Sequence, residues 1–148
     1  MATTPARTHR RIAALAIFAG ALLLVIGVRF IIVPESAART FGLTSALTGR
    51  ELHYVVGLRD LWLALLALAF AVFAEWRALA LWLLIGVLVC WGDAAVVAAY
   101  GGPPLAIAFH VGSGVFCLLV GLAAWRAHAH AQARGATAAA PAADRNAP

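Results

Sequence analysis

Charge is scarce in this chain. Arg, Asp and Glu together make up 11% of the 148 residues and lysine is absent, whereas hydrophobic residues make up 64%. A soluble domain of this length has too small an interior to bury so much apolar surface. The composition therefore predicts a membrane protein.

Cysteine is also rare, and several motifs are missing altogether. Cys90 and Cys117 are the two cysteines, and both fall within apolar stretches, so neither a disulfide framework nor a paired metal-binding motif is indicated. The chain has no Gly-rich phosphate loop, no Cys-x-x-Cys and no haem-ligating motif, which excludes a soluble redox or nucleotide-using enzyme. We expect neither a cofactor nor a metal ion.

Four apolar segments are long enough to cross a bilayer, which takes about 20 residues of helix. They are residues 12–33, 55–73, 79–99 and 105–125. This pattern predicts an all-α, integral membrane four-helix bundle preceded by a short arm over residues 1–11 and followed by a tail. The tail, residues 126–148, has no hydrophobic periodicity and is predicted to be disordered. Pro34 and Glu35 indicate a short surface helix after the first span.

The arginines carry an orientation signal. One set of span ends has Arg7, Arg10, Arg11, Arg77, Arg126, Arg134 and Arg145, whereas the opposite loop has only Arg39 and Arg50. The positive-inside rule then predicts a multi-pass protein of the cell inner (plasma) membrane with both termini cytoplasmic, and the lipid bilayer as its partner. Because the arginines are scattered rather than gathered in a patch, the net charge of +5 does not indicate nucleic-acid binding.

Five ionisable residues interrupt the apolar segments, and they share one depth. They are Arg29, Arg59, Asp60, Asp93 and His110, and we call them the polar layer. At about 1.5 Å per residue, each lies roughly 6–9 Å below the outer end of its span. Ionisable side chains at this depth are costly and rarely occur without a partner or a task. The polar layer is therefore the predicted functional site, in the outer half of the bundle.

Helical phase indicates which groups meet. On the fourth span, a face of small and polar residues is predicted to point into the bundle: His110, Ser113, Gly114, Cys117 and Gly121. A similar face is drawn on the third span: Trp82, Gly86, Val89, Asp93 and Tyr100. Asp93 and His110 should then approach one another across the turn at residues 101–104. We predict this pair to be catalytic and Arg59, Asp60 and Arg29 to bind the ligand.

Each of these residues also has a structural interpretation. Arg59 and Asp60 could be an ion pair that holds the bundle together. Arg29 is near enough to the interface to extend its guanidinium into water, and Asp93 and His110 could bond to one another to fix helix register. A metal site is conceivable by ligand type, but no ligand spacing supports it; its ligands would be His53, Asp60, Asp93 and His110.

Several short motifs resemble a small bacterial and fungal family. They are Arg29-Phe30, the run from Pro34 to Arg39, Phe41-Gly42-Leu43, Gly57-Leu58-Arg59-Asp60-Leu61, Gly92-Asp93-Ala94, and His110 with Gly112. This family is catalogued as domain of unknown function 4267, and it resembles the DoxX-like four-span proteins. The resemblance covers about Gly27 to Ala124. It implies a four-helix membrane bundle and the same five polar residues, without a particular activity.

Three functions are compatible with these residues. In the first, a small lipophilic molecule enters from the outer leaflet and is bound or converted by acid–base chemistry at Asp93 and His110, with Arg59 holding an anionic or carbonyl group. In the second, the protein is an accessory or structural subunit that packs against partners or forms a homo-oligomer. A small dimeric transporter ranks last, because the inner half of the bundle has no polar path.

Overall fold

The chain forms five helices in its computed structural model, which describes residues 5–43 and 50–143. They are α1 (Pro5–Ile32), α2 (Pro34–Phe41), α3 (Glu51–Val72), α4 (Trp76–Ala99) and α5 (Pro104–Ala143). Within these described ranges there is no strand. All except α2 are long and apolar enough to cross a membrane. The predicted all-α bundle with four spans is confirmed, and it fits a multi-pass membrane protein.

The last helix is much longer than predicted. It continues past the expected span end at Trp125 as far as Ala143, through residues for which the sequence predicts a disordered tail. The physical reason is composition: this segment is rich in alanine, which has the highest intrinsic helix propensity. A helix needs no hydrophobic periodicity to continue from a stable span. Residues 144–148, which were also predicted to be disordered, lie outside the described residues.

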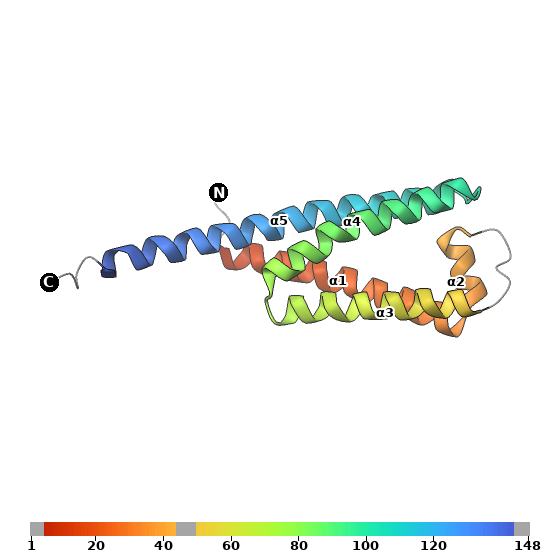
Figure 1. The fold of residues 1–148 in the computed structure, drawn as a ribbon, viewed down its shortest axis with the longest axis horizontal. Helices are drawn as coiled ribbons and strands as arrows, with labels where there is room; N and C mark the ends of the chain where they lie inside the picture. Colours follow the sequence, from red (N-terminus) through yellow and green to blue (C-terminus); the bar gives the residue numbers. More distant parts are fainter. Residues whose placement is uncertain (1–4, 44–49, 144–148) are drawn as a thin grey trace.

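The four long helices associate as two pairs, α1 with α3 and α4 with α5 (Figure 1). Small residues allow the close approach within each pair. A Cβ atom added to Gly27 of α1 would lie 2.9 Å from the carbonyl oxygen of Gly57 on α3. In the other pair, the Trp91 indole of α4 lies directly over Gly114 of α5. Contacts between the two pairs are much sparser than contacts within them.

The main apolar core lies toward one end of the bundle. Leu79 and Leu83 of α4 are fully buried there, and they pack with Ile12 of α1, Ala71 of α3 and Val120 of α5. This end carries the start of α1, the α3–α4 turn and the extension of α5, and we call it the terminal end (Figure 1). Elsewhere the bundle surface is apolar, as the 63% exposure of Phe18 and 72% of Leu88 illustrate. Such a surface suits contact with lipid.

The short helix α2 occupies the opposite end, which we call the α2 end (Figure 1). Its formation confirms the surface helix predicted from Pro34 and Glu35. Ala37 and Ala38 of α2 pack against Phe30 of α1. The chain then turns at Gly42, whose φ of 108° favours glycine.

Gly42 also packs the end of α2 against the α4–α5 pair. A Cβ atom there would lie 2.7 Å from both Val97 of α4 and Ala106 of α5. The α2 segment thus touches α1 on one side and the α4–α5 pair on the other. It joins the two pairs where the main core does not reach.

Candidate functional site

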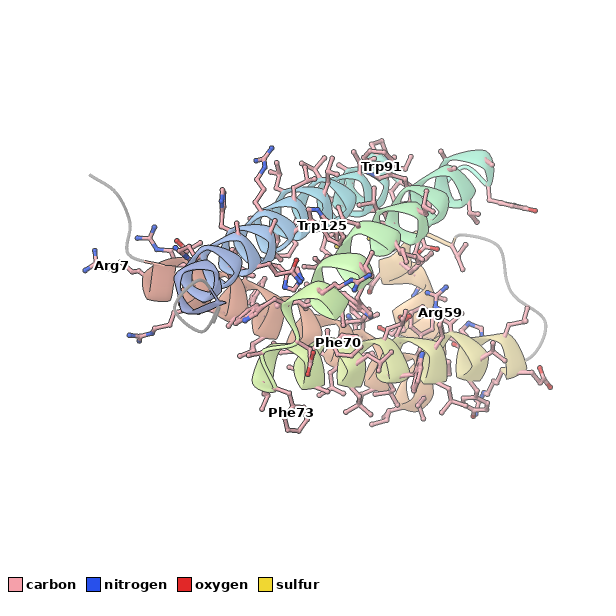
Figure 2. All side chains as sticks on the ribbon, turned by 60° about the vertical axis from the view of Figure 1, so that its left-hand side comes forward. Arg7, Arg59, Phe70, Phe73, Trp91 and Trp125 are labelled. Atoms are coloured by element: carbon pink, nitrogen blue, oxygen red, sulfur yellow. The ribbon has the colours of Figure 1, made fainter. Side chains whose placement is uncertain are left out.

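Arg59 lies between two carboxylates that come from different helix pairs. Its Nε donates a hydrogen bond to Oδ1 of Asp60 at 3.0 Å, and its Nη2 lies 3.9 Å from Oδ2 of Asp93. Figure 2 shows Arg59 on α3, and its contact with Asp93 reaches across to α4. We call these three residues the charge triad. Through Arg59, the triad links the α1–α3 pair to the α4–α5 pair.

The three members of the charge triad differ in exposure. The Asp60 side chain is 3% exposed, that of Asp93 is 24% exposed and that of Arg59 is 39% exposed. Asp60 faces α1, where its Cβ lies close to Gly27. The Arg59–Asp60 bond therefore satisfies a buried carboxylate, as the structural interpretation of this pair requires. Asp93 is held by a longer contact and remains accessible.

His110 of α5 is buried and bonded to the last residue of α2. Its Nε2 lies 3.0 Å from the carbonyl oxygen of Phe41, and the two rings are 4.4 Å apart between centroids. A carbonyl oxygen only accepts hydrogen bonds, so Nε2 must carry the hydrogen. In a neutral imidazole, Nδ1 is then left with a lone pair that can accept a proton or a hydrogen bond.

Asp93 and His110 lie at matching depths but are not bonded to one another. Each is six residues from the end of its helix at the α4–α5 turn, about 9 Å along the axis. Within the described parts of the chain, neither a hydrogen bond nor an ion pair joins them; Asp93 contacts Arg59 and His110 contacts Phe41. The approach of Asp93 and His110 to one another stays a prediction.

Arg29 is directed toward α2 rather than toward the charge triad. Its Nη2 donates to Oγ1 of Thr40 at 3.1 Å and to Oγ of Ser36 at 3.4 Å. The two hydroxyls are four residues apart on α2 and therefore lie on one face. The structure thus separates Arg29 from the other four residues of the polar layer. It gives Arg29 a role in docking α2 onto α1.

His53 of α3 is buried beside the aromatic rings at the α2 end. It is 5% exposed, and its Nδ1 has no hydrogen-bond partner among the described residues. Its ring centroid lies 6.2 Å from that of Phe30, which in turn contacts the ring of Phe41. No group of three or more His, Cys, Asp and Glu side chains in the described ranges could hold a metal ion. The metal site that was conceivable from ligand type is therefore not assembled there.

The family model described as domain of unknown function (DUF4267) matches residues 20–125. The chain belongs to this family. No curated protein matches the chain, and no solved structure matches it. The similarity to DoxX-like proteins stays a prediction.

The matched DUF4267 region contains the whole polar layer, α2 and the four spans apart from the first half of α1. It ends at Trp125, where the last span was predicted to end, and so excludes the extension of α5. The site and the helix pairs that position it are therefore features of the family region.

The helix faces drawn from the sequence are right for α5 and partly wrong for α4. On α5, His110, Gly114, Cys117 and Gly121 are all buried. On α4, Val89 is 39% exposed and Tyr100 is 67% exposed. The buried stripe of α4 instead follows Leu79, Leu83, Val87, Ala94 and Val97. Asp93 lies beside this stripe, which explains why it is only half-buried.

Sequence reasoning did not identify Phe41 and Gly42 as parts of the site. Phe41 supplies the carbonyl acceptor for His110, and Gly42 seats the end of α2 against α4 and α5. Backbone groups leave no residue-type signal, so the Phe41 contact was hidden. Gly42 does carry a signal, because a glycine just after a short helix is typical of a left-handed cap.

Proposed function

We propose that this protein binds a small lipophilic molecule within the membrane, where the charge triad and His110 lie between the two helix pairs. One observation carries the proposal: Asp93 is 24% exposed and, among the described residues, is held only by a 3.9 Å contact to Arg59. A carboxylate at this depth is costly, and a purely structural one would be bonded as closely as Asp60 is. Asp93 and Nδ1 of His110 are the acid–base groups of the proposed site.

Photolabelling in nanodiscs tests this proposal. A diazirine-bearing alkyl probe is activated in the presence and absence of excess unlabelled dodecanol, dodecylamine or dodecanoate, and the labelled peptides are mapped by mass spectrometry. We expect competed labelling at the α2 end of α4 and α5 and weaker competition by dodecylamine in Asp93→Asn. Glu75→Gln, an exposed carboxylate at the α3–α4 turn, is the control. Labelling spread evenly over the lipid-facing surface and not competed would count against a site.

The orientation belongs to the same proposal. Arg7, Arg10 and Arg11 line an open hollow at the start of α1, and Arg77 follows the α3–α4 turn at the same end (Figure 1). The positive-inside rule places this terminal end on the cytoplasmic side of a plasma membrane. The polar layer then opens toward the outer leaflet. If this orientation holds, a reporter fused after residue 148 gives the cytoplasmic signal and a reporter within the α4–α5 turn gives the external signal; the reverse pattern would contradict it.

The second candidate is an accessory subunit that packs against a partner or a second copy. Its support is the outward position of Gly92 on α4 and Gly112 on α5, where an added Cβ would meet nothing within 4 Å. Small residues on an open helix face permit close approach of another helix. Crosslinking in native membranes is the test, and recovery of monomer alone would count against this candidate.

A further inference from the structure

The charge triad contains one more carboxylate than it has cations. Arg59 bonds to Asp60 at 3.0 Å, while Asp93 lies 3.9 Å from the same guanidinium. The other arginine of the polar layer, Arg29, donates to hydroxyls of α2. An anionic ligand would therefore meet a cation that two carboxylates already surround. A ligand that brings positive charge would instead pair with Asp93.

His110 adds a second acceptor at the same depth. Its Nε2 hydrogen is committed to the Phe41 carbonyl, so the neutral ring offers only the Nδ1 lone pair. Asp93 and His110 thus present acceptors rather than donors. A ligand that satisfies both must supply hydrogen-bond donors.

Two aromatic rings lie beside His110. The ring of Phe41 lies 4.4 Å from it and that of Phe109 lies 5.8 Å away, between centroids. Aromatic faces attract ammonium groups, and they do so more strongly where water is excluded. The rings also provide an apolar surface for an alkyl chain. The surplus carboxylate, the two hydrogen-bond acceptors and the aromatic rings all favour the same chemical class of ligand.

We infer that the ligand is a lipophilic amine, in which an apolar chain carries a protonated ammonium group that pairs with Asp93 and donates a hydrogen bond to Nδ1 of His110. This inference rests on the proposed function. The ammonium could belong to a free amine dissolved in the membrane or to the headgroup of phosphatidylethanolamine. Both sources offer the same donor group on an apolar chain.

Competition among chain-matched probes tests the inference. Dodecylamine, dodecanol and dodecanoate are each titrated against the diazirine probe, with the purified full chain in phosphatidylcholine nanodiscs. We expect dodecylamine to bind at least about tenfold more tightly than dodecanoate. Asp93→Asn should remove this preference, Asp93→Glu should retain it, and the control Glu75→Gln should leave it unchanged. Equal or tighter binding of dodecanoate would overturn the inference, as would an intact preference in Asp93→Asn.

The same experiment separates this inference from the proposed function. Competition by dodecanol or dodecanoate, but not by dodecylamine, would leave a lipophilic site standing and overturn the amine. Failure of all three to compete would overturn both. Gel filtration and circular dichroism of each variant check that it is folded. Repeating the titration in phosphatidylethanolamine nanodiscs identifies the source, because a lipid headgroup in the site would weaken dodecylamine binding there and a free-amine site would not.

Discussion

The Arg59 guanidinium lies 3.9 Å from the Asp93 carboxylate, across the boundary between the two helix pairs. Arg59 also donates a hydrogen bond, at a shorter distance of 3.0 Å, to the buried Asp60 of its own helix. One cation thus holds a buried carboxylate tightly and a half-exposed one loosely. This difference separates the structural part of the polar layer from the part available to a ligand, and the first two predictions test it.

Arg59→Gln should destabilise the protein, because it leaves Asp60 buried without its cation. Removing one partner of a buried pair costs about 3–5 kcal/mol, and the partial exposure of Arg59 puts the expected loss near the lower figure, about 3 kcal/mol. For a chain of this length, we expect a fall in Tm of roughly 6–12 °C. Thermal melts followed by tryptophan fluorescence in one detergent measure it. The double variant with Asp60→Asn should recover much of the loss; no recovery would mean that Arg59 stabilises the bundle through other contacts.

Asp93→Asn should leave the melt nearly unchanged. Its long, partly exposed contact with Arg59 contributes no more than about 1 kcal/mol. Asp60→Asn, by contrast, should lower the Tm clearly, since a buried charge-assisted hydrogen bond is lost. An unchanged or higher Tm in Asp93→Asn indicates a carboxylate kept for function rather than stability. A fall as large as that in Asp60→Asn would favour a structural role for Asp93.

The spans and the polar layer could be predicted from the sequence because both follow from local composition and depth. Twenty or so apolar residues have few alternatives to a membrane helix, and Arg59, Asp60, Asp93 and His110 are conspicuous within them. The short helix α2 was also predictable, since Pro34 and Glu35 are local signals.

The partners of these residues were not predictable, because they depend on how the helices pair. Sequence reasoning joined Asp93 to His110 across the α4–α5 turn. In the structure, Asp93 contacts Arg59 of the other pair, and His110 bonds to a backbone carbonyl of α2. The contact of Asp93 with Arg59 follows from the rotation of α4, whose buried stripe runs through Leu83 and Val87 beside Asp93. An error of a fraction of a turn in helical phase changes which neighbour a side chain reaches.

Gly57→Ala should destabilise the α1–α3 pair. The added methyl would lie 2.8 Å from Cγ1 of Ile31 and 2.9 Å from the carbonyl oxygen of Gly27, which is backbone and cannot rotate away. Overpacking of this kind costs about 1–3 kcal/mol, more than alanine returns in helix propensity. Gly92→Ala is the matched control, because its methyl would meet nothing within 4 Å. We expect Gly92→Ala to melt at or slightly above the wild-type temperature, and equal losses in the two variants would contradict the close approach at Gly57.

His110 should tolerate glutamine better than phenylalanine. His110→Phe keeps an aromatic ring against Phe41 but leaves the Phe41 carbonyl without its donor, which costs about 1–3 kcal/mol for a buried acceptor. The amide of His110→Gln can still donate to that carbonyl. We therefore expect the order of Tm to be wild type, His110→Gln, His110→Phe. The loss in His110→Phe should be accompanied by faster proteolysis within α2 as this helix detaches. If His110→Phe were as stable and as protease-resistant as the wild type, the hydrogen bond to Phe41 would not be what holds α2 against α5. The packing of Gly42 against Val97 and Ala106 would then have to hold α2 there alone.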